Sequence, residues 1–418
     1  MFKTPRGTVD ILPDDQPYWR HVEAQATELC ERFGYRRIDT PIFEESGLFV
    51  RSVGEATDVV EKEMYSFSDR SGDSMTLRPE ATAAVCRAYL QHGMHVLPQP
   101  VRLYSVGAPM FRYDRPQAGR QRQFHHVNVE AIGDPDASVD SEVVELAWRF
   151  FAGVGLRGLT LTLNSIGDQA CRPGYLDALR RYYEPLVPGL CADCKRRFRE
   201  NPLRLLDCKK ESCQPHAGKA PRSLDHLCEA CRAHWDELTA SLDLVALPYT
   251  VDHRLVRGLD YYTRTVFEVV PPAEGAQSTL GGGGRYDGLI EQLEGRPTPG
   301  VGFACGVERI ILNMKRQGVT LAQQAPVKAV VAYVGGAAKG PALKLASDLR
   351  GAGLSVVLAP AGKSLKAQMR FAGALQAPYV LIMGDDEVRD GTVTLKEMAG
   401  GEQRQVPVAD AATTLAPL

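Results

Sequence analysis

The chain has 418 residues, which is enough for two or three domains with a hydrophobic core each. Its hydrophobic content of 44% and charged content of 24% are ordinary for a soluble globular protein, and no run approaches the ~20 apolar residues of a membrane span. The net charge of -2 argues against wholesale coating of nucleic acid but leaves a local basic surface open. The N-terminal residues show no apolar signal-peptide region, so we expect a cytoplasmic protein with no membrane partner.

The first part of the chain predicts a helix followed by strands. Residues 14–33 carry apolar side chains at helical spacing and stop before Gly34. A strand-like segment broken by Pro41 follows, and residues 101–133 predict two strands joined by a long basic loop. Strands connected with few crossover helices indicate a largely antiparallel sheet, and therefore an α+β domain.

The rest of the chain predicts an insertion and a second domain. Residues 168–245 are cysteine-rich, basic and mostly helical in pattern, and strands return after them. Beyond a linker candidate at 321–326, strand and helix patterns alternate as β-α-β-α-β, which predicts a small α/β domain with mainly parallel strands. We therefore expect a catalytic domain at 1–325, which contains the insertion, and a C-terminal domain at 326–418.

Charged side chains gather near the ends of the predicted strands. In TLRPEAT, Arg78 and Glu80 follow a strand and Thr82 opens a helix, an arrangement that helix capping would also explain. Arg112 and Glu130 lie on the two strands of the hairpin-like segment, where they can face one surface. The arginine guanidinium is planar, permanently charged and bidentate, so it suits a phosphate.

The segment RLVRGLDYYTRTVFE (254–268) sets two arginines and an aspartate around a glycine, followed by two tyrosines. A salt-bridged sheet edge and a pocket for a small zwitterion both explain this pattern. The later run GGGGRYDG would let a backbone approach a ligand closely. A site uniting these segments would bind a polyphosphate together with a small amine-bearing acid. Its charged members would be Arg112, Arg257, Arg309, Glu80 and Glu130.

At these residues the chain resembles the histidyl-tRNA synthetases, which are class II aminoacyl-tRNA synthetases. RIDTPIFEESGLF, FRYDRPQAGRQRQFHHVNVE and GVGFACGVERI resemble the three motifs that the whole class shares. LVRGLDYYTRTVFE and GGGGRYDGL resemble the two signatures particular to the histidine enzymes. The resemblance runs essentially end to end. It implies ATP-dependent ligation of L-histidine to tRNA(His) through a histidyl-adenylate, with release of AMP and diphosphate.

The resemblance also implies a role for each matching position. Arg257 would bridge the histidine carboxylate and the α-phosphate of ATP, and Arg112 would hold the same phosphate, so these two are the expected catalytic residues. The other histidine-binding residues would be Glu80 and Thr82 at the α-amino group, Glu130 and Tyr262 at the imidazole, and His126, Tyr261 and Tyr286 around the pocket. The other ATP-binding residues would be Arg120 and Arg309 at the outer phosphates and Phe124 stacked on adenine. Mg²⁺ would accompany the ATP.

The implied fold is a class II catalytic domain with a central antiparallel sheet, a helical insertion and a C-terminal α/β anticodon-binding domain. The implied assembly is a homodimer with Pro41 at its interface. Contacts with tRNA would come from a basic loop and from the C-terminal domain. Their candidates are Arg115, Gln117 and Arg120 at the acceptor end, and Lys363, Lys366 and Arg370 at phosphates.

Two alternatives remain open. A synthetase-like regulatory subunit could sense histidine without catalysis, but such paralogues lose parts of the ATP site or the C-terminal domain, and both are present here. A class II synthetase for proline or threonine would not explain the pair RGLDYY and GGGGRYDG.

His126 stands where the family usually has glutamine. Neutral histidine can donate and accept hydrogen bonds through different nitrogens, but it can also gain a charge near neutral pH. We therefore predict that the affinity for the amino acid falls as His126 becomes protonated. A KM for histidine that stays flat between about pH 5.5 and 8 would contradict this.

Seven of the ten cysteines lie in the insertion, where they suggest metal or plain thiols rather than disulfides. Two CxxC pairs have the spacing of zinc knuckles. A structural Zn²⁺ and a set of reduced thiols both fit, since the synthetase chemistry needs no zinc. The pairs are Cys191/Cys194 and Cys228/Cys231, and the residues between them that could add ligands are Cys208, Cys213 and His216.

Overall fold

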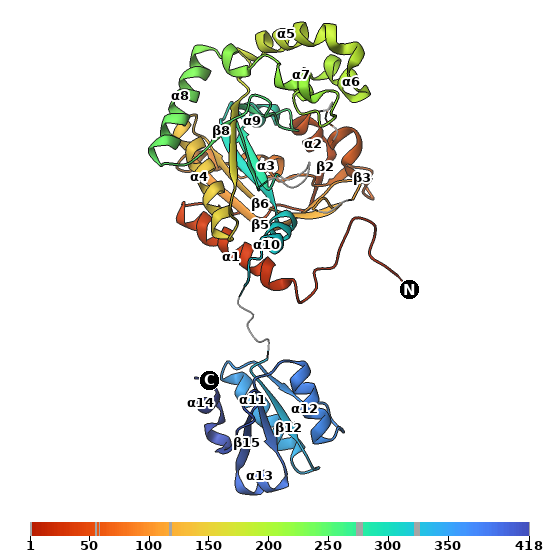
Figure 1. The fold of residues 1–418 in the computed structure, drawn as a ribbon, viewed down its shortest axis with the longest axis vertical. Coiled ribbons are helices and arrows are strands. Elements are labelled where there is room, and N and C mark those ends of the chain that lie inside the picture. The colour runs from red at the N-terminus through yellow and green to blue at the C-terminus, as the bar shows by residue number, and fades with distance from the viewer. Residues whose placement is uncertain are drawn as a thin grey trace. The chain divides into compact units, whose positions relative to one another are not determined.

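The computed structural model describes residues 2–54, 57, 59–116, 119–272, 279–321 and 327–417. Gln117 and all but the first residue of the expected linker lie outside this set. The chain forms two compact units, Met1–Leu321 and Ala322–Leu418 (Figure 1). Among the described helices, none has the length and apolar character that crossing a bilayer requires.

An eight-stranded sheet forms the centre of the first unit. Its six inner strands pair antiparallel, and a short parallel strand lies at each edge. The predicted central antiparallel sheet is therefore confirmed. The strands in spatial order are β1 (Arg36–Arg37), β5 (Val101–Phe111), β6 (Gln123–Ile132), β11 (Gly300–Gly306), β10 (Gly281–Arg285), β9 (Thr263–Val270), β7 (Thr160–Ser165) and β8 (Thr250–Val251).

Helices cover one face of this sheet with a shared apolar core. The helices are α1 (Gln16–Arg32), α4 (Ala137–Gly153), α8 (Glu229–Leu244) and α10 (Val307–Arg316). Strand β6 explains the division between the two faces, because side chains alternate along a strand. Val127 and Val129 point into the helix-covered core, whereas Asn128 and Glu130 point to the opposite face, where they line a cavity.

Smaller elements surround the opposite face. A three-stranded sheet consists of β2 (Phe43–Glu45), β4 (Ser74–Leu77) and β3 (Tyr65–Ser68). The helices near it are α2 (Ser46–Val53), α3 (Thr82–Gln91) and α9 (Leu289–Gln292), with single turns at Val59–Glu63 and Met94–Val96.

The insertion between β7 and β8 is helical, as predicted. It contains α5 (Arg172–Tyr183), α6 (Ala192–Glu200) and α7 (Gln214–Gly218), with 3₁₀ turns at Glu184–Gly189, Pro202–Leu205 and Ser223–His226. Its last helix, α8, differs from the others because Trp235, Leu238 and Leu242 join the core of the large sheet. The helix therefore belongs to the covering layer of the catalytic sheet.

A buried ion pair joins the sheet to α4. Arg285 and Asp140 are both 0% exposed, and the guanidinium also donates to the carbonyl oxygens of Asp134 (3.0 Å) and Asp136 (3.1 Å). A buried pair is retained when further hydrogen bonds satisfy the remaining donors, which is the case here. The arginine of the GGGGRYDG run is therefore a structural residue, a role that the sequence pattern did not reveal.

The second unit is built on a five-stranded sheet with the order β13–β12–β14–β15–β16. Three strands are parallel, as predicted, but β15 and β16, which were not predicted, extend the sheet in antiparallel orientation. The elements are β12 (Ala329–Tyr333), α11 (Lys339–Gly351), β13 (Val356–Leu358), α12 (Leu365–Ala374), β14 (Tyr379–Met383), α13 (Asp385–Asp390), β15 (Thr392–Glu397), β16 (Gln403–Pro407), a turn at Val408–Asp410 and α14 (Ala411–Leu415).

Candidate active site

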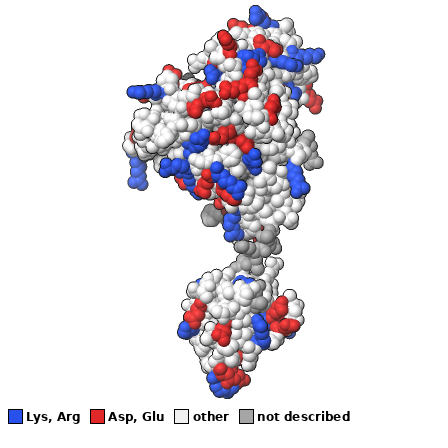
Figure 2. Space-filling view, turned by 90° about the vertical axis from the view of Figure 1, so that its left-hand side faces the viewer, with Lys and Arg blue, Asp and Glu red and all other residues white. Residues whose placement is uncertain are grey.

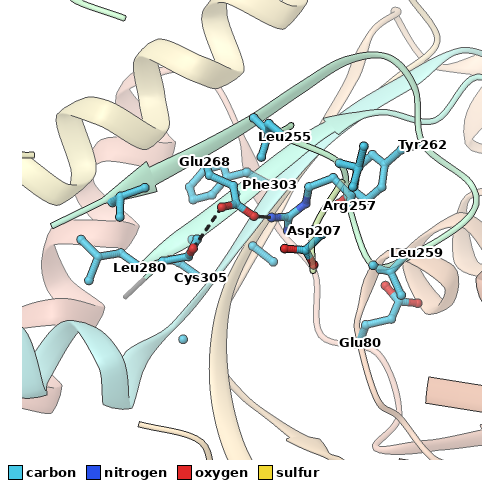
Figure 3. A pocket seen from close by; sticks show the side chains of 18 of the residues that line it. Glu80, Asp207, Leu255, Arg257, Leu259, Tyr262, Glu268, Leu280, Phe303 and Cys305 are labelled. Carbon is cyan, nitrogen blue, oxygen red and sulfur yellow. Dashed lines mark hydrogen bonds and ion pairs between the residues drawn. The ribbon is translucent and has the colours of Figure 1, made fainter. Parts of the chain in front are cut away.

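The face of the sheet opposite α1 and α4 opens into a cavity of about 1070 Å³, part of which is drawn in Figure 3. All of the site residues predicted from the sequence line it, although they come from five separate segments of the chain. They are Glu80, Thr82, Arg112, Arg120, Phe124, His126, Glu130, Arg257, Tyr261, Tyr262, Tyr286 and Arg309. The insertion adds part of the wall, including Arg204 and Asp207.

At one end of the cavity lies the buried carboxylate of Glu130. Glu130 is 1% exposed, and it accepts hydrogen bonds from the Thr82 hydroxyl (2.6 Å), the Asn128 amide (2.9 Å) and the Tyr286 hydroxyl (2.5 Å). Burial raises the pKa of Glu130 to about 7, because these hydrogen bonds only partly compensate for the loss of water. A Cβ on Gly302 would lie 2.0 Å from Oε2 of Glu130, so only glycine leaves room for this side chain.

Glu80 has a structural role that can be seen directly. Its two carboxylate oxygens accept the backbone N–H groups of Thr82 (2.7 Å) and Ala83 (2.9 Å), which cap the first turn of α3. Burial nevertheless raises the pKa of Glu80, which is 4% exposed. Arg78 faces away from the cavity and binds the carbonyl oxygens of Pro109 and Thr40, both at 2.9 Å. The expectation of helix capping in this segment is thus correct for Glu80.

Arg257 occupies the middle of the cavity wall, with the Glu268 carboxylate against its guanidinium (Figure 3). Burial lowers the pKa of Arg257, but the charge of Glu268 has the opposite effect and raises it overall. The guanidinium carbon lies 5.7 Å from the centroid of the Tyr262 ring. A Cβ on Gly282 would lie 2.8 Å from the guanidinium, so the glycine run gives this arginine its space.

The two other charged residues of RLVRGLDYY have different partners from Arg257. Arg254 is about half exposed and forms an ion pair of 2.8 Å with Asp252, so the expectation of a salt bridge at the sheet edge applies to this arginine. Asp260 accepts a hydrogen bond from the Asn201 amide at 2.9 Å. Arg254 and Arg257 both line the main cavity, whereas Asp260 lines two smaller neighbouring pockets.

Three further arginines gather at the other end of the cavity. Arg112 donates to the carbonyl oxygen of Pro79 (2.9 Å), and Arg309 donates to those of Gly119 (2.8 Å) and Thr279 (2.9 Å). Arg120 pairs with the carboxylate of Asp114. Burial lowers the pKa of Arg309, and the positive charges of Arg120 and Arg112 lower it further.

Arg112 and Arg309 are fixed by neutral carbonyl groups, so their charges remain available to an anion, whereas Arg120 is held by the carboxylates of Asp114 and Glu63. Burying several cations close together is unfavourable unless an anion compensates them. The arrangement is therefore suited to a polyphosphate, whose charge would relieve the repulsion.

The surroundings of His126 bear on the predicted effect of its protonation. Burial lowers the pKa of His126 to about 3, and the positive charges of Arg112 and Arg309 contribute to the shift. A pKa this low would keep the ring neutral near pH 7, which argues against the predicted loss of affinity through its protonation. Its Nδ1 is buried and has no hydrogen-bond partner among the described residues. A neutral ring in this position can offer the nitrogen to a ligand.

We expect the variant His126→Gln to show the same pH dependence of the KM for histidine as the unchanged protein. Histidine itself and Glu130 titrate in this range, so the ratio of the two KM values is the informative quantity. It should stay constant between about pH 5.5 and 8, because neither side chain at position 126 changes its charge there. A ratio that falls or rises with pH would mean that His126 does titrate.

Three residues that support the site, Asn128, Glu268 and Arg172, were not predicted from the sequence. Asn128 and Glu268 have no assigned role in the recognised motifs, yet they hold Glu130 and Arg257. Asn128 lies two residues before Glu130, so the alternation of the strand could have revealed it. Arg172 donates to the carbonyl oxygen of Tyr262 at 2.6 Å, and no local pattern indicates this contact, because α5 is far away in the sequence.

Fold and cavity together are those of a class II aminoacyl-tRNA synthetase. The chain belongs to the histidyl-tRNA synthetase family: the model of that family, described as histidyl-tRNA synthetase, matches residues 7–168 and 199–310. A second family model, described as anticodon binding domain, matches residues 328–417. The resemblance inferred from the sequence motifs is confirmed.

Individual proteins agree with this assignment. A histidine–tRNA ligase of Dehalococcoides mccartyi is 55% identical over 408 residues, which are 98% of this chain and 97% of the relative. The crystal structure of apo histidyl-tRNA synthetase from S. aureus is 38% identical, covers 99% of this chain and 100% of its own, and has a TM-score of 0.84. A structure from Bacillus halodurans C, described as an ATP phosphoribosyltransferase regulatory subunit/histidyl-tRNA synthetase, is 24% identical, covers 92% of this chain and 98% of its own, and has a TM-score of 0.66. That last likeness shows the fold alone.

Proposed function

We propose that the protein is a histidine–tRNA ligase. It would activate L-histidine with ATP to form histidyl-adenylate and diphosphate, and then transfer the histidyl group to tRNA(His) with release of AMP. The observation that carries this proposal is the single cavity in which the carboxylate cluster around Glu130 adjoins a group of arginines. A carboxylate pocket suits an imidazole, arginines suit a polyphosphate, and the first step requires both ligands in contact.

Histidine would occupy the carboxylate end of the cavity. Glu80 and Thr82 would hold its α-amino group, and Glu130 and Tyr262 would bind the imidazole nitrogens. Ionised Glu130 accepts hydrogen bonds only, so it would select a ring that presents an N–H. The side chains that would shape the pocket around the ring are His126, Tyr261 and Tyr286.

ATP would occupy the arginine end. An oxygen of the histidine carboxylate would attack the α-phosphorus, and the bond to diphosphate would break. Arg257 would contact both reactants, and Arg112 would hold the α-phosphate, so their charges would stabilise the negative charge that builds on the non-bridging oxygens. Arg120 and Arg309 would hold the outer phosphates, and Phe124 would stack on adenine.

Mg²⁺ would bind chiefly through the phosphates of ATP, as this ion usually does, and would neutralise part of their charge. The cavity wall fits this role, because Glu268 offers a carboxylate beside Arg257. Its Oε2 accepts a hydrogen bond from Thr279 at 3.0 Å, which orients the carboxylate.

The terminal ribose hydroxyl of tRNA(His) would then attack the adenylate, and AMP would leave. We assign residues 1–325 to the catalytic domain and 326–418 to the anticodon-binding domain. Positive and negative side chains are mixed on the face seen in Figure 2, so local groups of cations would contact the RNA. The candidates remain Arg115, Gln117 and Arg120 at the acceptor end, and Lys363, Lys366 and Arg370 around the start of α12.

The active form would be a cytoplasmic homodimer. Apolar side chains next to Pro41 support this assembly, because Ile42, Phe43 and Phe67 are each more than 40% exposed. Phe43 and Phe67 pack against each other across the small sheet, with ring centroids 6.3 Å apart. An exposed apolar patch of this kind is typical of an interface.

ATP–pyrophosphate exchange, measured with each of the twenty amino acids, tests the activity. We expect exchange with histidine alone, followed by charging of tRNA(His). The alternative, a regulatory subunit that senses histidine, is less well supported, since the chain matches histidine–tRNA ligases over nearly its full length. Binding of histidine without any exchange would favour that alternative and contradict the proposal.

A further inference from the structure

The cysteines of the insertion form two separate clusters. Four thiols converge in the first, and three thiols with one carboxylate converge in the second. In each cluster, the ligand atoms all lie within 4.8 Å of one another. The first cluster is Cys191, Cys194, Cys208 and Cys213, and the second is Asp168, Cys171, Cys228 and Cys231. The two CxxC pairs thus do not share a site, and His216, which we named as a ligand candidate, belongs to neither.

The spacing of the thiols fits a metal better than a disulfide. Four sulfurs at about 2.3 Å from a tetrahedral Zn²⁺ lie about 3.8 Å from each other. The Sγ atoms of Cys191 and Cys208 are 3.9 Å apart, nearly twice the length of a disulfide bond. All ten cysteines of the chain are free thiols.

Both CxxC pairs have the same local geometry. Cys191 precedes α6 with φ -65° and ψ 162°, and Cys228 precedes α8 with φ -67° and ψ 167°. The second cysteine of each pair lies in the first turn of the helix that follows. Neither Cys191 nor Cys228 caps its helix with its side chain, so both sulfurs are available to the clusters. Cys191 also donates its backbone N–H to the Sγ of Cys213 at 3.5 Å, a contact that would orient this sulfur.

We propose that each cluster holds one structural Zn²⁺, with four cysteine ligands at the first site and one aspartate and three cysteines at the second. Four protein ligands close the tetrahedron and leave no position for a substrate, so both ions would be structural. Each binding thiol would lose its proton to solvent. At the second site, Asp168 is oriented by a hydrogen bond of 3.0 Å from the backbone N–H of Ala170 and by an ion pair of 3.4 Å with Arg264.

The short helices α6 and α7 bury little apolar surface of their own, although α5 and the turns of the insertion contribute to a larger apolar core. Cys194 is the one buried residue of α6, and Ala217 is the one buried residue of α7. Short helices with so little apolar burial are often held in place by a crosslink or a metal. Cys30 in α1 lies in the apolar core of the sheet and belongs to no such group of four ligand atoms among the described residues, so it serves as an ordinary core residue.

Because the two sites lie in different parts of the insertion, the two ions would stabilise different segments of it. Asp168 lies where the chain leaves β7, and Cys228 lies where it enters α8, so the second ion would fasten both ends of the insertion. Cys208 lines the main cavity together with Asp207 and Lys209, so the first ion would hold part of the cavity wall. The family model matches residues up to 168 and from 199, and the segment between supplies three of the seven cysteines.

Zinc analysis of the full-length protein, purified under reducing conditions without a chelator, tests the proposal. We expect about two equivalents per chain. The variants Cys208→Ala and Cys231→Ala should each lose one equivalent, whereas Cys30→Ala, which removes an equally buried thiol outside the clusters, should retain both. Less than about a tenth of an equivalent would overturn the proposal. If the unchanged protein holds only one equivalent, the proposal is overturned for the cluster whose cysteine variant still holds that equivalent.

X-ray absorption at the zinc edge keeps the test independent of how well the variants fold. The unchanged protein should show mainly sulfur neighbours at about 2.3 Å, with a minor oxygen contribution from the second site. Coordination dominated by nitrogen or oxygen would mean that the metal sits elsewhere, and it would overturn the assignment of both sites.

Discussion

The variant Arg257→Ala should lose roughly 10³-fold in kcat/KM for histidine-dependent ATP–pyrophosphate exchange. Arg257 lies in the middle of the cavity wall, between the carboxylate cluster and the arginines, and its guanidinium is fixed by Glu268. In the proposed reaction it contacts both reactants, so its removal costs alignment as well as stabilisation of the developing charge. The loss should fall mainly on kcat, since these contacts strengthen in the transition state.

Two variants control this experiment. Arg257→Lys keeps the charge but loses the planar fork, so we expect an activity between those of the alanine variant and the unchanged protein. Arg149→Ala removes an exposed arginine that pairs with Glu145 on the surface of α4, and it should leave exchange unchanged. An Arg257→Ala variant that keeps more than about a tenth of the activity, or a loss confined to KM, would contradict the role of Arg257 in the chemical step.

Much of the site could be predicted because its residues lie in continuous motifs with a regular alternation. The strand period places His126, Asn128 and Glu130 on one face, and recognition of the family then assigns most of the chemistry. The antiparallel order of the inner strands could likewise be inferred from the scarcity of crossover helices. Local patterns of this kind can be recognised in a single sequence.

Properties that depend on partners distant in the sequence could not be predicted. Burial has the largest effect on the pKa of His126, and Arg112 and Arg309 lower it further, although Arg309 follows it by more than a hundred and fifty residues. Arg285 pairs with Asp140 across 145 residues, so its structural role was not visible in the glycine run. The cysteine pattern indicated candidate ligands but not which of them share a site, because the two CxxC pairs could also have formed one site together.

The raised pKa of Glu130 predicts that its substitution increases the stability of the protein while it lowers the activity. The folded protein keeps this carboxyl protonated up to about pH 7, whereas the unfolded chain releases the proton near its usual 4.5. Folding is therefore penalised progressively as the pH rises from about 4.5 to 7, and the penalty is complete above that range, at roughly 3 kcal/mol. Below about pH 4.5 both states are protonated and the penalty vanishes.

We expect Glu130→Gln to remove this penalty while it abolishes histidine recognition. At pH 8 its free energy of unfolding, measured by denaturant titration, should exceed that of the unchanged protein by up to about 3 kcal/mol, and the difference should shrink towards pH 4.5. The amide preserves the shape of the side chain but cannot accept the imidazole N–H as an anion, so exchange with histidine should fall by about 10²-fold or more.

The control variant Glu28→Gln alters an exposed side chain, so it should change neither the free energy of unfolding nor the exchange activity appreciably. If the gain in free energy of unfolding of Glu130→Gln over the unchanged protein is smaller at pH 8 than at pH 5, the carboxylate is better solvated than its burial indicates. An active Glu130→Gln protein would instead remove Glu130 from the recognition of the ring.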